Sequence, residues 1–271
     1  MIKNLLVIGE NSKLAKNFLD VTKGNKKFNL MSCRHNKVPT DISNIDYVIN
    51  FSLNPRMYLG KYEKDIDQDL FLAEKIKNTH AKFLTISSRQ VYGIHKSLYS
   101  FKESDEINPK RISNYGLNKL RSEKNIVDAF GDESRLIICR SSNIFGDEVG
   151  SRNFLGIAIE SLTKNGFISL NSNRKVIKDF LPIAFHSKFI ESLIINNAFG
   201  IFNVGSGIQI SLKDFCDALI MGFGLGYIKD NDIIDDQFSL DIGKLNKQAN
   251  FNINKDTILS HAYNIANKYR N

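Results

Sequence analysis

The first half of the chain alternates short apolar runs with longer amphipathic stretches, and this alternation limits its possible folds more than any other feature. Apolar runs of this length bounded by turn residues are typical of buried strands, and the amphipathic stretches are typical of helices. Strands joined by helical crossovers form a parallel sheet that is covered by helices on both faces. The sequence therefore predicts an α/β fold with a doubly wound parallel sheet of the Rossmann type.

The predicted elements divide the chain into a large part and a small part. Strands are predicted at 4–9, 28–33, 46–51, 82–87 and 135–140, with helices at 13–21, 66–77 and 112–130. Later helices are predicted at 153–164, 212–221 and 257–269, with short strands at 167–170 and 201–207. No Pro/Gly-rich linker separates the two halves. We expect residues 1–150 and roughly 176–211 to form the sheet domain, and 151–175 with 212–271 to form a smaller substrate-binding lobe.

Composition removes several classes of protein from consideration. The three cysteines, Cys33, Cys139 and Cys216, are widely spaced and form no CxxC pair, which argues against a disulfide scaffold or a metal site and favours a reducing cytoplasm. No apolar run is long enough for a membrane span. The net charge of +8 fits either a nucleic-acid binder or a lysine-rich solvated surface. Because no motif interleaves the basic residues with aromatics, no nucleic-acid partner is predicted.

The run VIGENSKLA (7–15) joins the first strand to the first helix, where the pyrophosphate of a dinucleotide would meet the helix N-terminus. Gly9 supplies the tight turn, and Ser12 stands where the second glycine of the usual motif allows the backbone to approach phosphate. The predicted cofactor contacts in this loop are Gly9, Ser12, Lys13 and Leu14. An ordinary strand–turn–helix would account for the loop almost as well.

The second strand ends in SCRHN, without the acidic residue that holds a ribose 2′-hydroxyl. Ser32, Arg34 and His35 suit a 2′-phosphate instead, so NADP(H) is favoured over NAD(H). Asp41 and Ile42 precede the third strand and are predicted to contact the adenine. The competing interpretation is a surface arginine and an exposed turn aspartate.

The segment SNYGLNKLRSE (113–123) carries the strongest chemical signal. Tyr115 and Lys119 are four residues apart on a predicted helix, so both project from one face. A neighbouring ammonium favours the phenolate, which would lower the pKa of the tyrosine and make it a general acid/base. Ser88 follows the strand at 82–87, at the sheet edge where ligands bind. Its hydroxyl either caps a turn or contacts a substrate.

With these residues in view, the sequence resembles the extended short-chain dehydrogenase/reductase superfamily, in its NAD(P)-dependent nucleotide-sugar epimerase/dehydratase/reductase branch. The matching segments run in order over nearly the whole chain: the strand–loop–helix at 4–19, SSRQVYG (87–93), YGLNK (115–119), RSSNIFG (140–146), KDFLPI (178–183) and FNVGSG (202–207).

The resemblance implies roles for the matching residues. Tyr115 would be the catalytic acid/base, Lys119 would bind the nicotinamide ribose, and Ser88 would hydrogen-bond the reacting sugar oxygen. Asp65 stands near the position of a structural Asn that supports the lysine in relatives. Relatives also form homodimers through the helix that carries the Tyr/Lys pair, so a homodimer is the expected assembly.

Three further residues take their expected roles from the same resemblance. Ser141 occupies the place of a proline near the nicotinamide. Asn143 and Asn153 are expected to contact the sugar nucleotide, through its phosphates or its sugar.

The sequence departs from the branch at several positions. Dehydratases carry Asp-Glu after the Ser/Thr of this motif, whereas this chain has Arg89 and Gln90, which cannot perform those proton transfers. Both are predicted to contact the substrate. Lys178 stands where an arginine is common, and a lysine cannot bind a phosphate with the bidentate geometry of arginine. Gln237 and Phe238 lie where a phosphate-clamping arginine is frequent.

Arg89 and Gln90 thus disfavour a dehydratase. The expected NADP(H) preference, the degraded glycine loop and the short C-terminal half favour an exchangeable cofactor, and therefore a reductase of a dTDP- or GDP-linked 4-keto-6-deoxyhexose in the synthesis of deoxysugars for surface polysaccharides. A nucleotide-sugar 4-epimerase with tightly bound NAD is the alternative enzyme. A non-catalytic nucleotide- or nucleic-acid-binding member of the fold is the alternative from another class.

Overall fold

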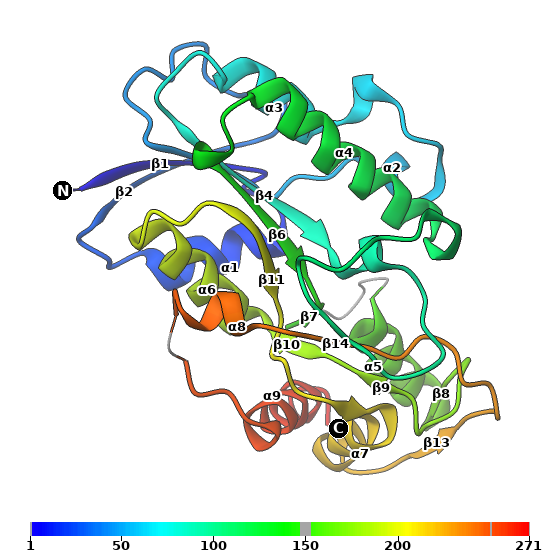
Figure 1. Ribbon diagram of the computed structural model, residues 1–271. Coiled ribbons are helices and arrows are strands. Elements are labelled where there is room, and N and C mark those ends of the chain that lie inside the picture. The colour runs from blue at the N-terminus through cyan, green and yellow to red at the C-terminus, as the bar shows by residue number, and fades with distance from the viewer. Residues whose placement is uncertain (1, 147–152, 250, 271) are drawn as a thin grey trace.

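A parallel six-stranded sheet is the centre of the computed structural model, which describes residues 2–146, 153–249 and 251–270 (Figure 1). From one edge to the other, its strands are β2 (Phe28–Cys33), β1 (Lys3–Ile8), β3 (Tyr47–Asn50), β4 (Lys82–Ser88), β6 (Leu136–Ser141) and β11 (Gly200–Val204). All five strands predicted in the first half are present, and their ends differ from the prediction by at most one residue.

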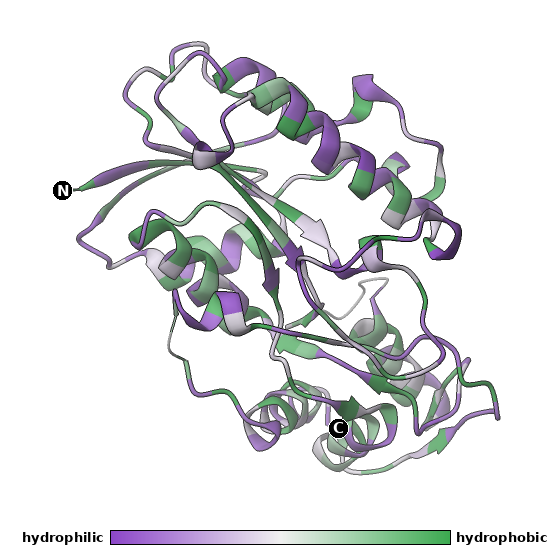
Figure 2. Cartoon of the chain, viewed as in Figure 1, coloured by the Kyte–Doolittle hydropathy of each residue, from purple (hydrophilic) through white to green (hydrophobic). Residues whose placement is uncertain are grey.

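Helices cover both faces of this sheet, which confirms the predicted doubly wound fold. On one face lie α1 (Lys13–Thr22) and α6 (Ile183–Ile195), and on the other lie α3 (Gln68–Ile76) and α4 (Asn114–Phe130) (Figure 1). Alternate residues of β1 lie on opposite faces of the sheet, because successive side chains of a strand point in opposite directions. Leu5 and Val7 pack in the cluster with α1 and α6, whereas Leu6 and Ile8 pack in the cluster with α3 and α4. The strands are accordingly mostly hydrophobic, as Figure 2 shows.

The strand order reverses between β1 and β3. From β1 the chain passes to β2 at the sheet edge, then returns through residues 34–46 to β3 on the other side of β1. In open α/β sheets, ligands bind beyond the carboxyl ends of the strands at such a reversal. The expected position of a ligand is therefore beyond Ile8 and Asn50.

A second lobe lies below the sheet in Figure 1 and has its own hydrophobic cluster. It contains α5 (Phe154–Asn165), β8 (Phe167–Ser169), α7 (Leu212–Phe223), β13 (Tyr227–Lys229) and α9 (Lys255–Asn267). Short strands link it to the sheet domain: β7 (Asn143–Phe145), β9 (Ile177–Lys178), β10 (Phe180–Pro182) and β12 (Ile210–Ser211). The remaining elements are α2 (Arg56–Leu59), β5 (Ser100–Phe101), β14 (Ser239–Leu240), α8 (Gly243–Asn246) and short 3₁₀ turns.

The division of the chain that we proposed from sequence remains a proposal, because Leu245 and Ala249, assigned to the small lobe, pack in the cluster of the sheet domain. β11 and α6 join the sheet domain, although Phe180 and Ile210 of the same stretch pack into the cluster of the small lobe. The proposed boundary at residues 150 and 151 lies outside the described residues.

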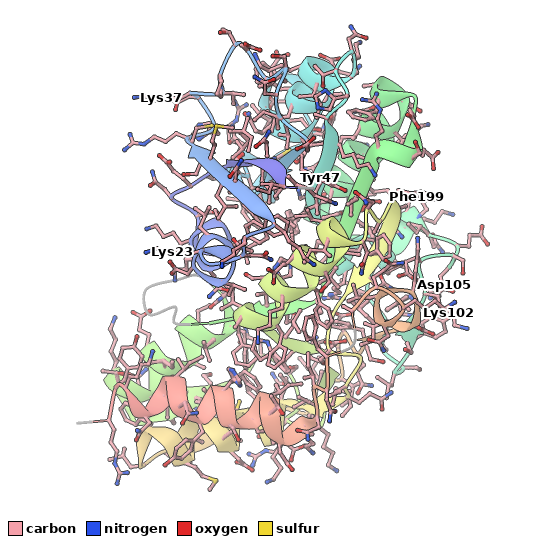
Figure 3. All side chains as sticks on the ribbon, turned by 90° about the vertical axis from the view of Figure 1, so that its left-hand side faces the viewer. Lys23, Lys37, Tyr47, Lys102, Asp105 and Phe199 are labelled. Atoms are coloured by element: carbon pink, nitrogen blue, oxygen red, sulfur yellow. The ribbon has the colours of Figure 1, made fainter. Side chains whose placement is uncertain are left out.

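The surface agrees with a scattered basic charge. In Figure 3, Lys23 and Lys37 point away from the body of the protein on separate elements, whereas Tyr47 lies inside it and is 2% exposed. Among the helices that the structure describes, none has both the length and the apolar character needed to cross a membrane.

Candidate active site

Helix α4 places Tyr115 and Lys119 beside the end of β4. Its N-cap is Ser113, whose Oγ accepts a hydrogen bond from the Gly116 amide at 3.1 Å and donates one to Gln90 Oε1 at 2.7 Å. Gln90 therefore fixes the start of the helix relative to the segment that follows Ser88. Ser88, Tyr115 and Gln90 all line one cavity of about 540 Å³.

Lys119 is buried and held by two acceptors. Its Nζ donates to the Ile86 carbonyl at 2.8 Å and to Asp69 Oδ2 at 3.2 Å. Burial alone would lower the pKa of Lys119, but the Asp69 carboxylate and the Tyr115 phenol raise that pKa above its ordinary value. The lysine therefore stays protonated and contributes a fixed positive charge next to Tyr115.

The carboxylate that supports Lys119 is Asp69, and the expected role of Asp65 is wrong. Asp65 lies in an exposed 3₁₀ turn before α3, whereas Asp69 is 5% exposed in the first turn of that helix. Asn50 Nδ2 also donates to Asp69 Oδ1 at 2.6 Å. The sequence could have indicated that Asp69 is buried, because it precedes the core residues Leu72 and Ala73 by three and four positions and so shares their helix face.

Tyr115 does not have the lowered pKa that its spacing from Lys119 suggested. Burial raises the pKa of the phenol, and the opposing effects of the Lys119 ammonium and of a hydrogen bond with Ser88 are smaller. The net pKa is above its ordinary value. At neutral pH Tyr115 is therefore a phenol that can donate a proton.

Ser88 caps a turn, and its contact with a substrate remains a prediction. Its Oγ accepts a hydrogen bond from the Gln90 amide at 3.2 Å, which caps the 3₁₀ turn Arg89–Tyr92, and it also contacts Tyr115. In the sheet register Ser88 lies opposite Ser141 of β6. Ser141 is buried, and its Oγ lies 3.1 Å from His186 Nε2. Burial lowers the pKa of His186 to about 3, so this ring is neutral.

Tyr58 is a site residue that the sequence did not indicate. Its ring stacks on that of Tyr115 with 4.7 Å between centroids and 21° between planes, and it lines the same cavity. Asn118 of α4 holds the short helix α2 that carries Tyr58, because its Nδ2 donates to the carbonyls of Met57 and Gly60 at 3.0 and 2.8 Å. The anchoring and the stacking together fix the phenol ring from one side.

Three of the residues that depart from the family pattern, Arg89, Gln90 and Lys178, line this cavity. Arg89 forms an ion pair with the buried Asp236, and its guanidinium stacks on the Phe238 ring at 4.0 Å from the centroid. Lys178 Nζ lies 3.4 Å from Asp236 Oδ2. Burial opposes ionisation of Asp236, but these two cations hold the pKa of its carboxyl below the ordinary value. The network ties the segment after Ser88 to the segment around Phe238.

Asp236→Asn is expected to lower the free energy of unfolding by about 3–5 kcal/mol, because it leaves two buried cations without their carboxylate. The matched control is Asp235→Asn, since the Asp235 side chain is 44% exposed and lies 3.8 Å from Lys178. Urea unfolding of both variants measures the difference. Equal stability of the two variants would contradict the importance of the Arg89–Asp236 pair.

The predicted substrate residues Arg89, Gln90, Asn143 and Asn153 all line this cavity. Asn143 begins β7, and its backbone amide donates to the Asp179 carbonyl at 3.2 Å. Asn153 is the N-cap of α5, where its Oδ1 accepts from the Gly156 amide at 2.9 Å. The cavity thus combines polar groups from the sheet domain and from the small lobe. Their contacts with a substrate remain a prediction.

A second cavity, of about 420 Å³, lies at the reversal of strand order. The residues that line it follow three different strands: Gly9, Asn11 and Ser12 after β1, Arg34, His35 and Asn36 after β2, and Phe51, Ser52 and Leu53 after β3. Its position and its lining agree with the dinucleotide site predicted from the sequence.

The glycine turn fits the pyrophosphate of a dinucleotide. Gly9 has φ +85°, and a Cβ there would lie 2.8 Å from the Ser52 amide nitrogen, so only glycine suits this position. Ser12 Oγ accepts from the Ala15 amide at 3.1 Å. This cap leaves the amides of Lys13 and Leu14, the first two of α1, without an intrahelical acceptor. Such amides bind anions at helix N-termini.

Asp41 and Ile42, the residues predicted to contact the adenine, lie outside the lining of this cavity. Ile42 is 6% exposed and packs in the core beneath α3 and α4. The Asp41 carboxylate accepts a hydrogen bond from the Ser43 amide at 2.9 Å, which lowers its pKa. Their contact with adenine remains a prediction.

Comparisons with known proteins agree with this geometry. Residues 32–205 match the model of a family described as the NAD dependent epimerase/dehydratase family. No match to the chain was found among curated proteins.

Three similar solved structures are nucleotide-sugar enzymes. A dTDP-glucose 4,6-dehydratase from Bacillus anthracis, in complex with NAD, is 15% identical with a TM-score of 0.78, over 98% of this chain and 97% of that one. A UDP-N-acetylglucosamine 4-epimerase from Methanobrevibacter ruminantium, in complex with UDP-N-acetylmuramic acid, is 18% identical with a TM-score of 0.78, over 99% and 98%. A UDP-glucuronic acid 4-epimerase from Bacillus cereus, in complex with NAD, is 18% identical with a TM-score of 0.77, over 98% and 96%. At these identities the likeness establishes the fold.

Proposed function

The chain belongs to the NAD dependent epimerase/dehydratase family, and on that basis we propose that it reduces a nucleotide-linked 4-keto-6-deoxyhexose with hydride from a reduced nicotinamide dinucleotide. A dTDP- or GDP-linked sugar is the proposed substrate, and the proposed product is a deoxysugar for surface polysaccharides.

The observation that carries this proposal is the contact of Tyr115 with Ser88 in the wall of the large cavity, one helical turn from the buried Lys119. Reduction of a ketone requires a proton donor, and the raised pKa of Tyr115 keeps the phenol in its donating form. Arg89 and Gln90 replace the acidic pair of dehydratases, and both are engaged in structural contacts. Elimination of water from a sugar is therefore not supported by these residues.

The reaction assigns a separate task to each residue. A reduced dinucleotide bound to the protein would supply the hydride for the carbonyl carbon. Ser88 donates a hydrogen bond to the carbonyl oxygen, and the Tyr115 hydroxyl gives its proton to that oxygen as negative charge develops on it. Lys119 stabilises the resulting phenolate through its ammonium, which Asp69 holds in place. The ketone thus gains one hydride and one proton and becomes a secondary alcohol.

A nucleotide-sugar 4-epimerase with tightly bound NAD is the second candidate, supported by the family and by the 4-epimerases among the similar structures. Its first step is an oxidation, for which Tyr115 must accept a proton. The intact set of Ser88, Tyr115 and Lys119 in one site argues against a non-catalytic protein.

The test is to mix the protein with a reduced dinucleotide and dTDP- or GDP-linked 4-keto-6-deoxyhexoses, and to follow the absorbance of the reduced nicotinamide. We expect loss of absorbance that depends on the sugar. A parallel sample without dinucleotide receives UDP-sugars. Interconversion of C4 epimers in this second sample, with no oxidation of the dinucleotide in the first, would show that the protein is an epimerase and not a reductase. Tight RNA binding with neither activity would support a non-catalytic protein.

Two finer predictions remain proposals. The sequence favoured NADP(H) over NAD(H) on the basis of Arg34, which does line the second cavity. A homodimer through α4, the helix that carries Tyr115 and Lys119, is proposed from the resemblance.

A further inference from the structure

The end of β2 has a carboxylate beside it, although β2 itself supplies none. Between Asn11 and Thr40 the sequence has one acidic residue, Asp20, which lies on α1. The carboxylate near the strand end comes instead from Glu10, in the glycine turn. Its Oε2 accepts a hydrogen bond from Ser32 Oγ at 3.2 Å, and its Oε1 lies 3.7 Å from Arg34 Nε.

The backbone fixes Glu10 in this place. The amides of Gly9 and Glu10 both donate to the Cys33 carbonyl, at 2.9 and 3.2 Å, so the glycine turn is attached directly to the last residue of β2. The negative charge acts on the strand end, since it adds to burial in raising the pKa of the Cys33 thiol. Glu10 and Arg34 have side chains that are 33% and 58% exposed, which leaves both accessible to a ligand.

On the basis of the proposed function, we infer that Glu10 replaces the acidic residue missing from β2 and makes the protein select NAD(H) over NADP(H). The Rossmann fold commonly uses a carboxylate at the end of its second strand to accept a hydrogen bond from the ribose 2′-hydroxyl. Glu10 offers the same group at the same strand end, from a different segment of the chain. A 2′-phosphate would meet the negative charge of Glu10, which offsets the attraction of Arg34 for that phosphate.

This inference reverses the cofactor preference suggested by the sequence. Arg34 alone favours a 2′-phosphate, but an arginine paired with a carboxylate offers a phosphate less net positive charge. Glu10 lies in the glycine turn, a segment in which the sequence indicated only a tight turn and a helix N-cap. Reduction is possible with either dinucleotide, because both supply the same hydride, but selection of NAD(H) removes one of the sequence arguments for a reductase over an epimerase.

Titration of the protein with NADH and with NADPH, followed by the fluorescence of the bound reduced nicotinamide, tests the inference without turnover. We expect NADH to bind about tenfold more tightly, the factor that one charge-assisted hydrogen bond provides. Glu10→Gln should remove this preference and strengthen NADPH binding, because Arg34 is released. Arg34→Gln added to Glu10→Gln should abolish that gain.

Asp20→Asn is the matched control, since it removes one negative charge from the neighbouring α1 and should leave the NADH/NADPH ratio unchanged. Tighter binding of NADPH by the unmodified protein, or an unchanged ratio in Glu10→Gln, would overturn the inference while leaving the reductase proposal intact. Binding of neither dinucleotide would overturn both.

Discussion

Replacement of Tyr115 by phenylalanine is expected to lower the turnover number for reduction of a 4-keto sugar by about 10²–10⁴-fold, the contribution of a general acid. The ring and its stacking on Tyr58 are retained, so the cavity keeps its shape. The affinity for the dinucleotide should therefore change little. Steady-state rates and cofactor titrations measured on the same preparation separate the two effects.

Tyr263→Phe is the control, because this tyrosine lies on α9 of the small lobe and is 36% exposed. Its turnover should equal that of the unmodified protein. A Tyr115→Phe variant that retains more than about a tenth of the activity would show that another group donates the proton.

Asp69→Asn should have the largest effect on stability among the residues around Lys119. The variant leaves the ammonium of Lys119 buried without its carboxylate, and removal of one partner from a buried ion pair costs about 3–5 kcal/mol. The pKa of Lys119 should fall, since burial then acts without the opposing charge. Urea unfolding measures the loss of stability.

The stability that the Lys119–Asp69 pair contributes should also fall at high pH. The folded-state pKa of Lys119 is raised, so the stability that this group contributes is fully present below its unfolded pKa and is lost only as pH rises through the folded value. At neutral pH the unmodified protein therefore has the full contribution, and Asp69→Asn lacks it. Asp65→Asn is the matched control: equal losses in the two variants would contradict the assignment of Asp69 as the support of Lys119.

Much of the fold was predictable because it follows from local patterns. The apolar runs that became β1, β2, β3, β4 and β6 are short and bounded by polar residues, which fixes their ends closely. α6 was missed because IAFHSKFIESLII is apolar around most of its circumference and shows no clear amphipathic period. α6 is packed against both the sheet and α1, so a one-sided apolar face is not required of it.

The candidate site was predictable where spacing along one element determined it. Tyr115 and Lys119 share a helix face, and Ser88 follows a strand that ends beside that helix. The contacts of Asp69, Tyr58 and Glu10 depend instead on how separate segments pack, since each reaches its partner from a different element. The raised pKa of Tyr115 has the same origin: burial, which spacing does not reveal, outweighs the charge of Lys119.

Tracing the hydride is the most direct test of the central claim that Tyr115 and Ser88 serve reduction of a sugar ketone. The protein is supplied with a dinucleotide that carries deuterium at the transferable position of its reduced nicotinamide, together with a nucleotide-linked 4-keto-6-deoxyhexose. Nuclear magnetic resonance of the sugar product then locates the label. The account predicts one deuterium at C4 of each product molecule and an equal amount of oxidised dinucleotide. Epimerised UDP-sugars that form without label from the added dinucleotide, with no reduction of the keto sugar, would contradict it.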